Sequence, residues 1–327
     1  MQHLLIFFRK KPVAGISFAP YICRMQALLT IEKPPLFSFR ECLWFLDRGY
    51  DDCLFHIHNE QLTKLLLLGD QPVLFRISDA GNALAVHLLH GTISDEQIPV
   101  LRNHIMEWFD MHKDLTPFYA LLQRDKKLQY MPKEFEGLRL ISISDLFEAI
   151  CWSIIGQQIN LNFAYKLKRR LVESFGTSLT FGDHTWHLFP SPEKLASLSV
   201  EDLRPLQYSQ SKAKYLIGIA QAFAENRLSA PMLSALGDFN SMQQALTSHK
   251  GIGIWTANYV LMKTMRVPNA IPHGDVGLLK ALETHAIIKE RNETEKIDRY
   301  FKKYKGWEAY LVFYLWRSLA PPVFHAR

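Results

Sequence analysis

The chain has 327 residues, of which 48% are hydrophobic and 21% are charged. This composition provides a buried core, its length suggests two domains, and it argues against an intrinsically disordered protein. The formal net charge of +6 at pH 7 permits binding to a polyanion without requiring it.

Residues 1–24 are expected to form an extension that precedes the fold. The first residues are apolar before they are basic, which is the reverse of a secretory signal, and the apolar run is too short to span a membrane. A soluble cytoplasmic protein is therefore expected. The His56-x-His58 pair supplies only two ligands, so no metal site is predicted. A disulfide scaffold and a zinc finger are both disfavoured by the spacing of the four cysteines at positions 23, 42, 53 and 151.

The first half of the chain is predicted to contain antiparallel strands. Short apolar runs at 72–78 and 83–89 are separated by turns rich in Gly, Asp and Asn. A helix follows over about residues 98–108, where Ser94 and Gln97 form a capping box ahead of apolar residues at helical spacing. We expect an α/β domain over residues 25–115.

The second half, residues 116–327, is predicted to be helical beyond a charged stretch that ends near residue 136. Asp145 and Glu148 open one helix, and Gly176 closes the next. On that second helix the basic residues oppose an apolar stripe, which predicts a solvated face rather than a DNA contact. The basic residues are Lys166, Lys168, Arg169 and Arg170, and the stripe is Ala164, Leu167, Leu171 and Phe175.

A helix-hairpin-helix unit is predicted at about 241–265. Its first helix is expected to be capped by Ser241 and to run to about Ser248, and the second begins at Ile254. Between them, Gly251 and Gly253 permit positive φ and a close approach of the backbone to a ligand.

This hairpin has two interpretations. Its amides lie at a helix N-terminus, which suits a phosphate, and Lys250 adds a full positive charge. The alternative is an ordinary turn between two packed helices.

Asp275 follows Pro272 and Gly274 and precedes a segment with helical spacing, so it is predicted to be an N-cap. Capping alone would explain it. A capping carboxylate is also held ionised by the helix terminus, which suits a reaction that builds positive charge on a sugar. The two roles are compatible.

The hairpin and the segment that ends at Asp275 together match the signature of a known superfamily. The pattern Leu246…Gly251-Ile-Gly253-Ile-Trp255-Thr-Ala-Asn-Tyr259…Pro272-His-Gly-Asp275 resembles the helix-hairpin-helix, Gly/Pro-rich loop and Asp signature of a superfamily of DNA base-excision glycosylases. Its closest branch is DNA-3-methyladenine glycosylase II. Residues 145–159 are similar to the first core helix and Gly-Gln turn of that branch, and the resemblance extends from about Thr30 to Pro321.

The resemblance implies an α+β fold: an N-terminal antiparallel-sheet domain like that of the TATA-binding protein, then an all-α helix-hairpin-helix glycosylase core. No cofactor is required, although hairpins of the family often hold a monovalent cation through backbone carbonyls. The chain lacks the clustered cysteines that hold an iron-sulfur cluster in the endonuclease III branch.

The resemblance also assigns roles to residues. Asp275 matches the catalytic Asp. Trp255 stands where strand-nicking relatives carry a Schiff-base lysine, so a monofunctional enzyme that leaves an abasic site is expected. Trp255, Tyr259, Trp316 and Phe45 would line a pocket that attracts a cationic base by cation-π stacking, although aromatic residues at such positions also serve as core.

The expected DNA contacts gather around the hairpin. Gln158 matches the side chain that fills the gap left by an extruded base, and the alternative is a polar turn capped by Asn160. His273 is either a surface residue or a DNA contact. The expected DNA-binding residues are Lys250, Gly251, Ile252, Gly253, Thr256, Lys212, Gln157 and Gln158.

The leading hypothesis is a DNA glycosylase that removes alkylated bases such as 3-methyladenine and 7-methylguanine. Its expected partner is double-stranded DNA that contains damaged bases. The protein is expected to be a monomer associated with the nucleoid, and no membrane partner is expected. The alternatives are a glycosylase for oxidised purines and a non-catalytic helix-hairpin-helix protein that only binds DNA.

Overall fold

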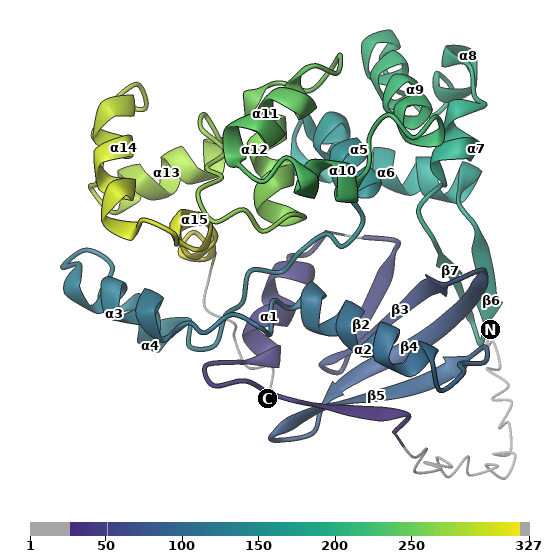
Figure 1. The fold of residues 1–327 in the computed structure, drawn as a ribbon, viewed down its shortest axis with the longest axis horizontal. Helices are drawn as coiled ribbons and strands as arrows, with labels where there is room; N and C mark the ends of the chain where they lie inside the picture. Colours follow the sequence, from purple (N-terminus) through teal and green to yellow (C-terminus); the bar gives the residue numbers. More distant parts are fainter. Residues whose placement is uncertain (1–26, 51, 321–327) are drawn as a thin grey trace, which may run out of the picture.

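The computed structural model describes residues 27–50 and 52–320, so the expected extension over residues 1–24 lies outside the described residues. A sheet and the helices packed on it form one part of the molecule, and a larger helical part lies beside it (Figure 1). The predicted α+β architecture is confirmed. Within the described residues, no helix is both long enough and apolar enough to cross a membrane.

The sheet is antiparallel with the strand order β1-β5-β4-β3-β2. Alternate residues of its central strands, such as Leu62, Val73 and Val86, are fully buried, because one face packs against α2. The Gln97 side chain accepts the Ser94 N–H at 3.0 Å, which is half of the predicted capping box. The elements are β1 (Leu29–Glu32), α1 (Phe39–Leu46), β2 (Phe55–His58), β3 (Gln61–Leu68), β4 (Gln71–Asp79), β5 (Ala83–His90) and α2 (Gln97–Trp108).

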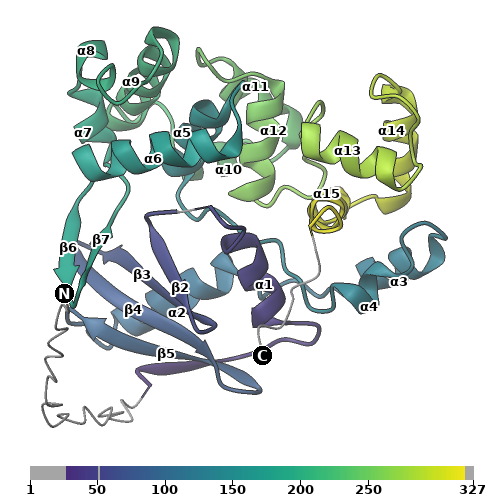
Figure 2. The ribbon, with the colours of Figure 1, turned by 180° about the vertical axis from the view of Figure 1, so that it is seen from behind.

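The helical part follows and includes one strand pair that the sequence did not predict. Strands β6 and β7 reach from the helices to the sheet, where Trp186 packs against Leu65 and Leu74 (Figure 2). The elements are α3 (Thr116–Arg124), α4 (Met131–Glu134), α5 (Leu146–Gly156), α6 (Leu161–Phe175), β6 (Ser178–Phe181), β7 (His184–His187), α7 (Pro192–Ala196), α8 (Val200–Leu203), α9 (Gln210–Ala224), α10 (Ala230–Ala235), α11 (Phe239–Thr247), α12 (Ile254–Lys263), α13 (Val276–Thr284), α14 (Thr294–Phe301), η1 (Lys302–Tyr304) and α15 (Glu308–Arg317).

The predicted helix ends are confirmed with two exceptions. Ser94 is not the cap of α2, because Glu96 takes that place without a side-chain hydrogen bond. Asp145 caps α5, Gly176 follows the last residue of α6, and the second hairpin helix begins at Ile254. Ser241 is not the cap of the first hairpin helix. Asp238 takes that place, and its carboxylate accepts the backbone N–H groups of Asn240 and Ser241.

The prediction for Lys168 is wrong. This side chain is not solvated: the residue is 4% exposed, and its ammonium lies 2.9 Å from Asp52 and 3.0 Å from Glu148. Burial opposes the charge, but the two carboxylates raise the pKa of Lys168 above its ordinary value. Lys166 is exposed, as expected. Because Asp52 precedes β2 and Glu148 lies in α5, this ion cluster joins the sheet part to the helical part.

A second ion pair also joins the two parts. Arg317, near the end of α15, is 1% exposed and lies 3.0 Å from Glu41 in α1. Its guanidinium also contacts the rings of Trp44 and Phe135. Residues of α1 and of the loop before β2 are therefore held firmly against the helical part, where the cavity lies.

Candidate active site

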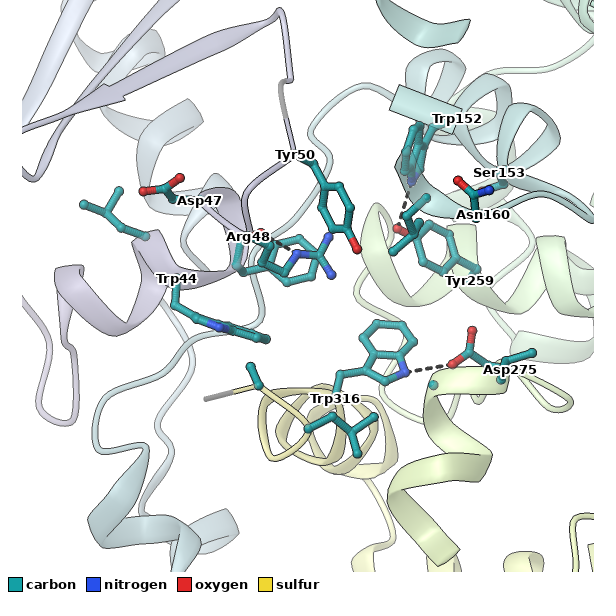
Figure 3. A pocket seen from close by; sticks show the side chains of 18 of the residues that line it. Trp44, Asp47, Arg48, Tyr50, Trp152, Ser153, Asn160, Tyr259, Asp275 and Trp316 are labelled. Carbon is teal, nitrogen blue, oxygen red and sulfur yellow. Dashed lines mark hydrogen bonds between the residues drawn. The ribbon is translucent and has the colours of Figure 1, made fainter. Parts of the chain in front are cut away.

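A cavity of about 1860 Å³ opens between the sheet part and the helical part. Its volume exceeds that of ordinary small-molecule pockets, so it is an open groove with a deeper site rather than a closed chamber. Figure 3 shows that Trp44, Arg48 and Tyr50 reach it from one side and Trp152, Tyr259, Asp275 and Trp316 from the other.

Asp275 lies on this cavity and is also the N-cap of α13. Its Oδ1 atom accepts the backbone N–H of Leu278 at 2.7 Å and the indole N–H of Trp316 at 2.9 Å. The two hydrogen bonds fix the orientation of the carboxylate at the helix N-terminus. Its other oxygen has no hydrogen bond to a described residue. The predicted cap is confirmed, and it holds a carboxylate at the cavity.

Gly277 gives Trp316 room to reach Asp275. A Cβ at position 277 would lie 3.2 Å from Asp275 Oδ1 and 3.4 Å from Trp316 Nε1. Sequence reasoning missed this residue, since a glycine in the first turn of a helix gives no signal of what it faces.

Three aromatic side chains form a continuous wall beside Asp275. The rings of Trp255 and Tyr259 stack with centroids 5.5 Å apart, and Tyr259 lies 6.2 Å from Trp316. Burial raises the pKa of Tyr259 to about 12, so its phenol is neutral at physiological pH. All three residues line the cavity, so they are not only core residues.

Trp152 belongs to the same wall and was not predicted. It lies in α5, and its indole N–H donates to the Tyr259 hydroxyl at 3.3 Å. The residues of α5 up to Ile155 are buried except Glu148, so its sequence has no amphipathic pattern to show which side chain faces a cavity. Tyr50 was also missed. It stacks on Tyr165 of α6 with centroids 4.9 Å apart.

Phe45 lies at the cavity, but other groups cover its ring. The guanidinium of Arg48 is 4.2 Å from the ring centroid and the ammonium of Lys263 is 3.9 Å from it. Phe313 packs against it with centroids 4.9 Å apart. Lys263 is fully buried and donates to the carbonyl of Ile141, and burial lowers its pKa well below the ordinary value.

The two hairpin glycines differ in the structure. Gly251 has φ of +91°, and a Cβ there would lie 2.4 Å from the ring of Tyr215 in α9. Gly253 has φ of −88°, so the expectation of positive φ is wrong for this residue. A Cβ at position 253 would meet no atom within 4 Å. The space beside Gly253 is open towards solvent, at the N-terminus of α12.

Most of the other residues expected to bind DNA brace this hairpin. The Gln157 side-chain amide donates to the Gly251 carbonyl at 2.8 Å and to the Thr256 hydroxyl at 3.0 Å. Lys212 donates to the carbonyl of Gln157 at 2.8 Å. Ile252 and Thr256 are buried, so their side chains are turned away from solvent.

Two of the residues expected to bind DNA have exposed polar side chains. Lys250 is exposed at the hairpin, and Gln158 is exposed on the cavity rim with φ of +57°. His273 is exposed beside Asp298 and does not line the cavity. Among the residues that the structure describes, no cluster of His, Cys, Asp or Glu could hold a metal ion.

Comparison with known proteins agrees with this geometry. Residues 151–306 match the family described as HhH-GPD superfamily base excision DNA repair protein. The chain is 37% identical over 295 residues to a DNA-3-methyladenine glycosylase of Bacillus subtilis, an alignment that covers 89% of this chain and 97% of that protein. The chain belongs to the HhH-GPD superfamily. It is a DNA glycosylase, and the alternative of a non-catalytic binding module is set aside.

Other matches concern the fold of this HhH-GPD protein. Residues 51–150 match the 8-oxoguanine DNA glycosylase N-terminal domain. A 3-methyladenine DNA-glycosylase from Archaeoglobus fulgidus superposes with a TM-score of 0.75 at 22% identity, covering 88% of this chain and 97% of that chain. An 8-oxoguanine glycosylase/lyase from Clostridium acetobutylicum bound to DNA gives 0.71 at 19% identity, covering 90% and 98%. The fold is therefore common to enzymes with different substrates, and the site must decide between them.

Proposed function

We propose that this HhH-GPD protein is a monofunctional glycosylase that hydrolyses the glycosidic bond of alkylated purines in DNA, such as 3-methyladenine and 7-methylguanine. The aromatic wall of Trp255, Tyr259 and Trp316 beside Asp275 carries this proposal. A purine methylated at N3 or N7 is cationic, and electron-rich ring faces attract a cation. The Bacillus subtilis relative named DNA-3-methyladenine glycosylase supports the same substrate class.

The reaction needs little from the protein beyond a placed negative charge. A cationic base leaves as a neutral molecule and takes the electron pair of the bond between its nitrogen and C1′. The sugar then carries oxocarbenium character, which the Asp275 carboxylate stabilises. Water adds to C1′ and loses a proton, and an abasic site remains. Trp316 and the N–H of Leu278 hold one carboxylate oxygen, so the other can face the sugar.

Within the described part of the chain no lysine lines the cavity, which supports hydrolysis over strand nicking. Trp255 stands where a Schiff-base lysine would be expected for a lyase. Lys263 lies in the same helix, but it is fully buried and donates to the carbonyl of Ile141. It therefore cannot reach a sugar in the cavity.

We also propose how the DNA is held. The amides at the N-terminus of α12 and the Lys250 ammonium would bind a phosphate, and the exposed Gln158 would fill the gap left by the extruded base. The hairpin carbonyls would accept a monovalent cation. The carbonyl of Gly251 already accepts the Gln157 amide, which leaves its second lone pair and the neighbouring carbonyls for such an ion.

The test is release of free bases from methylated duplex DNA, separated by chromatography. Wild type should release methylated purines, and Asp275→Asn should reduce release by about a hundredfold or more because the charge is lost. In a second experiment, borohydride is added to the reaction, because it would reduce a Schiff base between a lysine and the DNA to a stable covalent complex. Wild type should form no such complex.

A glycosylase for oxidised purines is the second candidate, because residues 51–150 match an 8-oxoguanine glycosylase domain. Faster release of 8-oxoguanine than of methylated bases, with a trapped complex, would favour it. It would also show that the substitution by Trp255 does not prevent a lyase reaction.

A further inference from the structure

Arg48 is a charged residue of the cavity to which the proposed mechanism gives no role. It follows α1, and its Nε donates to the Phe45 carbonyl at 2.9 Å. Its guanidinium carbon lies 4.2 Å from the centroid of the Phe45 ring and 5.8 Å from that of Tyr50. No carboxylate among residues 27–50 and 52–320 forms an ion pair with it. Its guanidinium, which also interacts with the side chain of Tyr165, therefore lies at the cavity without a carboxylate partner.

This guanidinium forms the surface that a base would meet at Phe45. The other cation on that ring, Lys263, is fully buried, so it contacts the ring from the core. Arg48 lines the cavity, so it contacts the ring from the open side of the site. An extruded base therefore meets hydrogen-bond donors rather than a bare aromatic face at this wall.

Arg48 and Asp275 lie at opposite ends of the space beside Tyr259. Burial raises the pKa of the Tyr259 phenol. The positive charge of Arg48 lowers this pKa and the negative charge of Asp275 raises it, so both charges act on the Tyr259 side chain. Figure 3 shows Arg48 and Asp275 approaching the space between Tyr259 and Trp316 from different sides. The glycosidic nitrogen must lie near Asp275 for the reaction. The far edge of a purine, which carries the substituent on C6, then points towards Arg48.

We propose that Arg48 is a specificity-determining residue that favours extruded purines with an oxygen on C6 over those with an amino group. A guanidinium has only donors, so it can bond a C6 carbonyl but faces donor against donor at an amino group. Arginine recognises the O6 edge of guanine in DNA by the same chemistry. This inference rests on the proposed function of the site.

The test compares two bases released from one DNA sample. DNA treated with a methylating agent contains both 7-methylguanine, which has the C6 oxygen, and 3-methyladenine, which has the amino group. Both bases are cationic, so repulsion by Arg48 affects both and cancels in the ratio of their initial release rates. In Arg48→Met, the ratio of 7-methylguanine to 3-methyladenine should fall at least about fivefold. Arg48→Lys, which keeps a donor, should recover most of the ratio.

The matched control is Arg40→Gln, which removes one positive charge from α1, where Arg40 pairs with Glu60 at 3.0 Å. It should leave the ratio unchanged. A partly unfolded variant lowers both rates equally, so the ratio remains a valid measure. An unchanged ratio in Arg48→Met, or an equal fall of both rates, overturns the role of Arg48. Failure of wild type to release either base instead overturns the proposed function.

Discussion

The substitution Gly277→Ala should slow base release without lowering the stability of the protein. The added methyl group would lie 3.2 Å from Asp275 Oδ1 and 3.4 Å from the indole nitrogen of Trp316, so one of these groups must move by a few tenths of an ångström. The hydrogen bond between them, now 2.9 Å long, would be weakened or lost. A hydrogen bond to a charged group contributes about 1.5–3 kcal/mol, so its full loss corresponds to roughly a 10- to 160-fold loss in the rate of base release.

The same change should not destabilise the fold. Replacing glycine by alanine inside a helix contributes about 0.5–1 kcal/mol of stability, which offsets the strain of the close contact. The assay is single-turnover base release together with thermal unfolding. Gly218→Ala is the matched control, because Gly218 lies in α9 with no atom within 4 Å of a Cβ position. If Gly277→Ala releases bases as fast as Gly218→Ala, the hydrogen bond to Asp275 does not support catalysis.

Three further changes test other parts of the structure. Trp316→Phe keeps a ring in the wall but removes the donor to the Asp275 carboxylate, so it should slow release by a similar factor as measured under single turnover; full activity would contradict this. Lys168→Met leaves the largely buried carboxylates of Asp52 and Glu148 without their ammonium partner and should reduce the free energy of unfolding in urea by about 3 kcal/mol. Because the folded pKa of Lys168 is raised, its contribution should hold at neutral pH and decline only above the ordinary pKa of 10.5. Burial, with the charge of Lys64, lowers the pKa of His104 to about 4, so the unfolded chain binds more protons below pH 6.5. Stability should fall between pH 6.5 and 4, and His104→Leu should flatten that part of the curve measured by thermal unfolding.

Local signals in the sequence predicted much of the site. Glycine, aspartate and the spacing of apolar residues marked the start of α12 and the cap at Asp275, because these features depend on neighbours in the chain. The cap of α11 was misplaced by three residues since Asp238 and Ser241 are both good caps, and only the fold shows where the helix begins.

Features that depend on distant partners were not predictable. Lys168 looked like a solvated lysine on a helix face, and its partner Asp52 is 116 residues earlier in the chain. Arg48 and Tyr50 come from the segment after α1, where no periodic pattern relates them to the helices across the cavity. Their place at the cavity depends on how the two parts of the molecule pack together.

The contacts of the hairpin bear on its use in protein engineering. Gly251 is required because the ring of Tyr215 in α9 occupies the place of a side chain, and Gln157, the residue that follows α5, bonds both the hairpin carbonyl and Thr256. A peptide of residues 241–265 transplanted into a foreign scaffold would carry the signature without the two residues that shape its backbone. A successful transplant must therefore include positions 157 and 215, and the hairpin is better regarded as the tip of a unit made of α5, α9, α11 and α12.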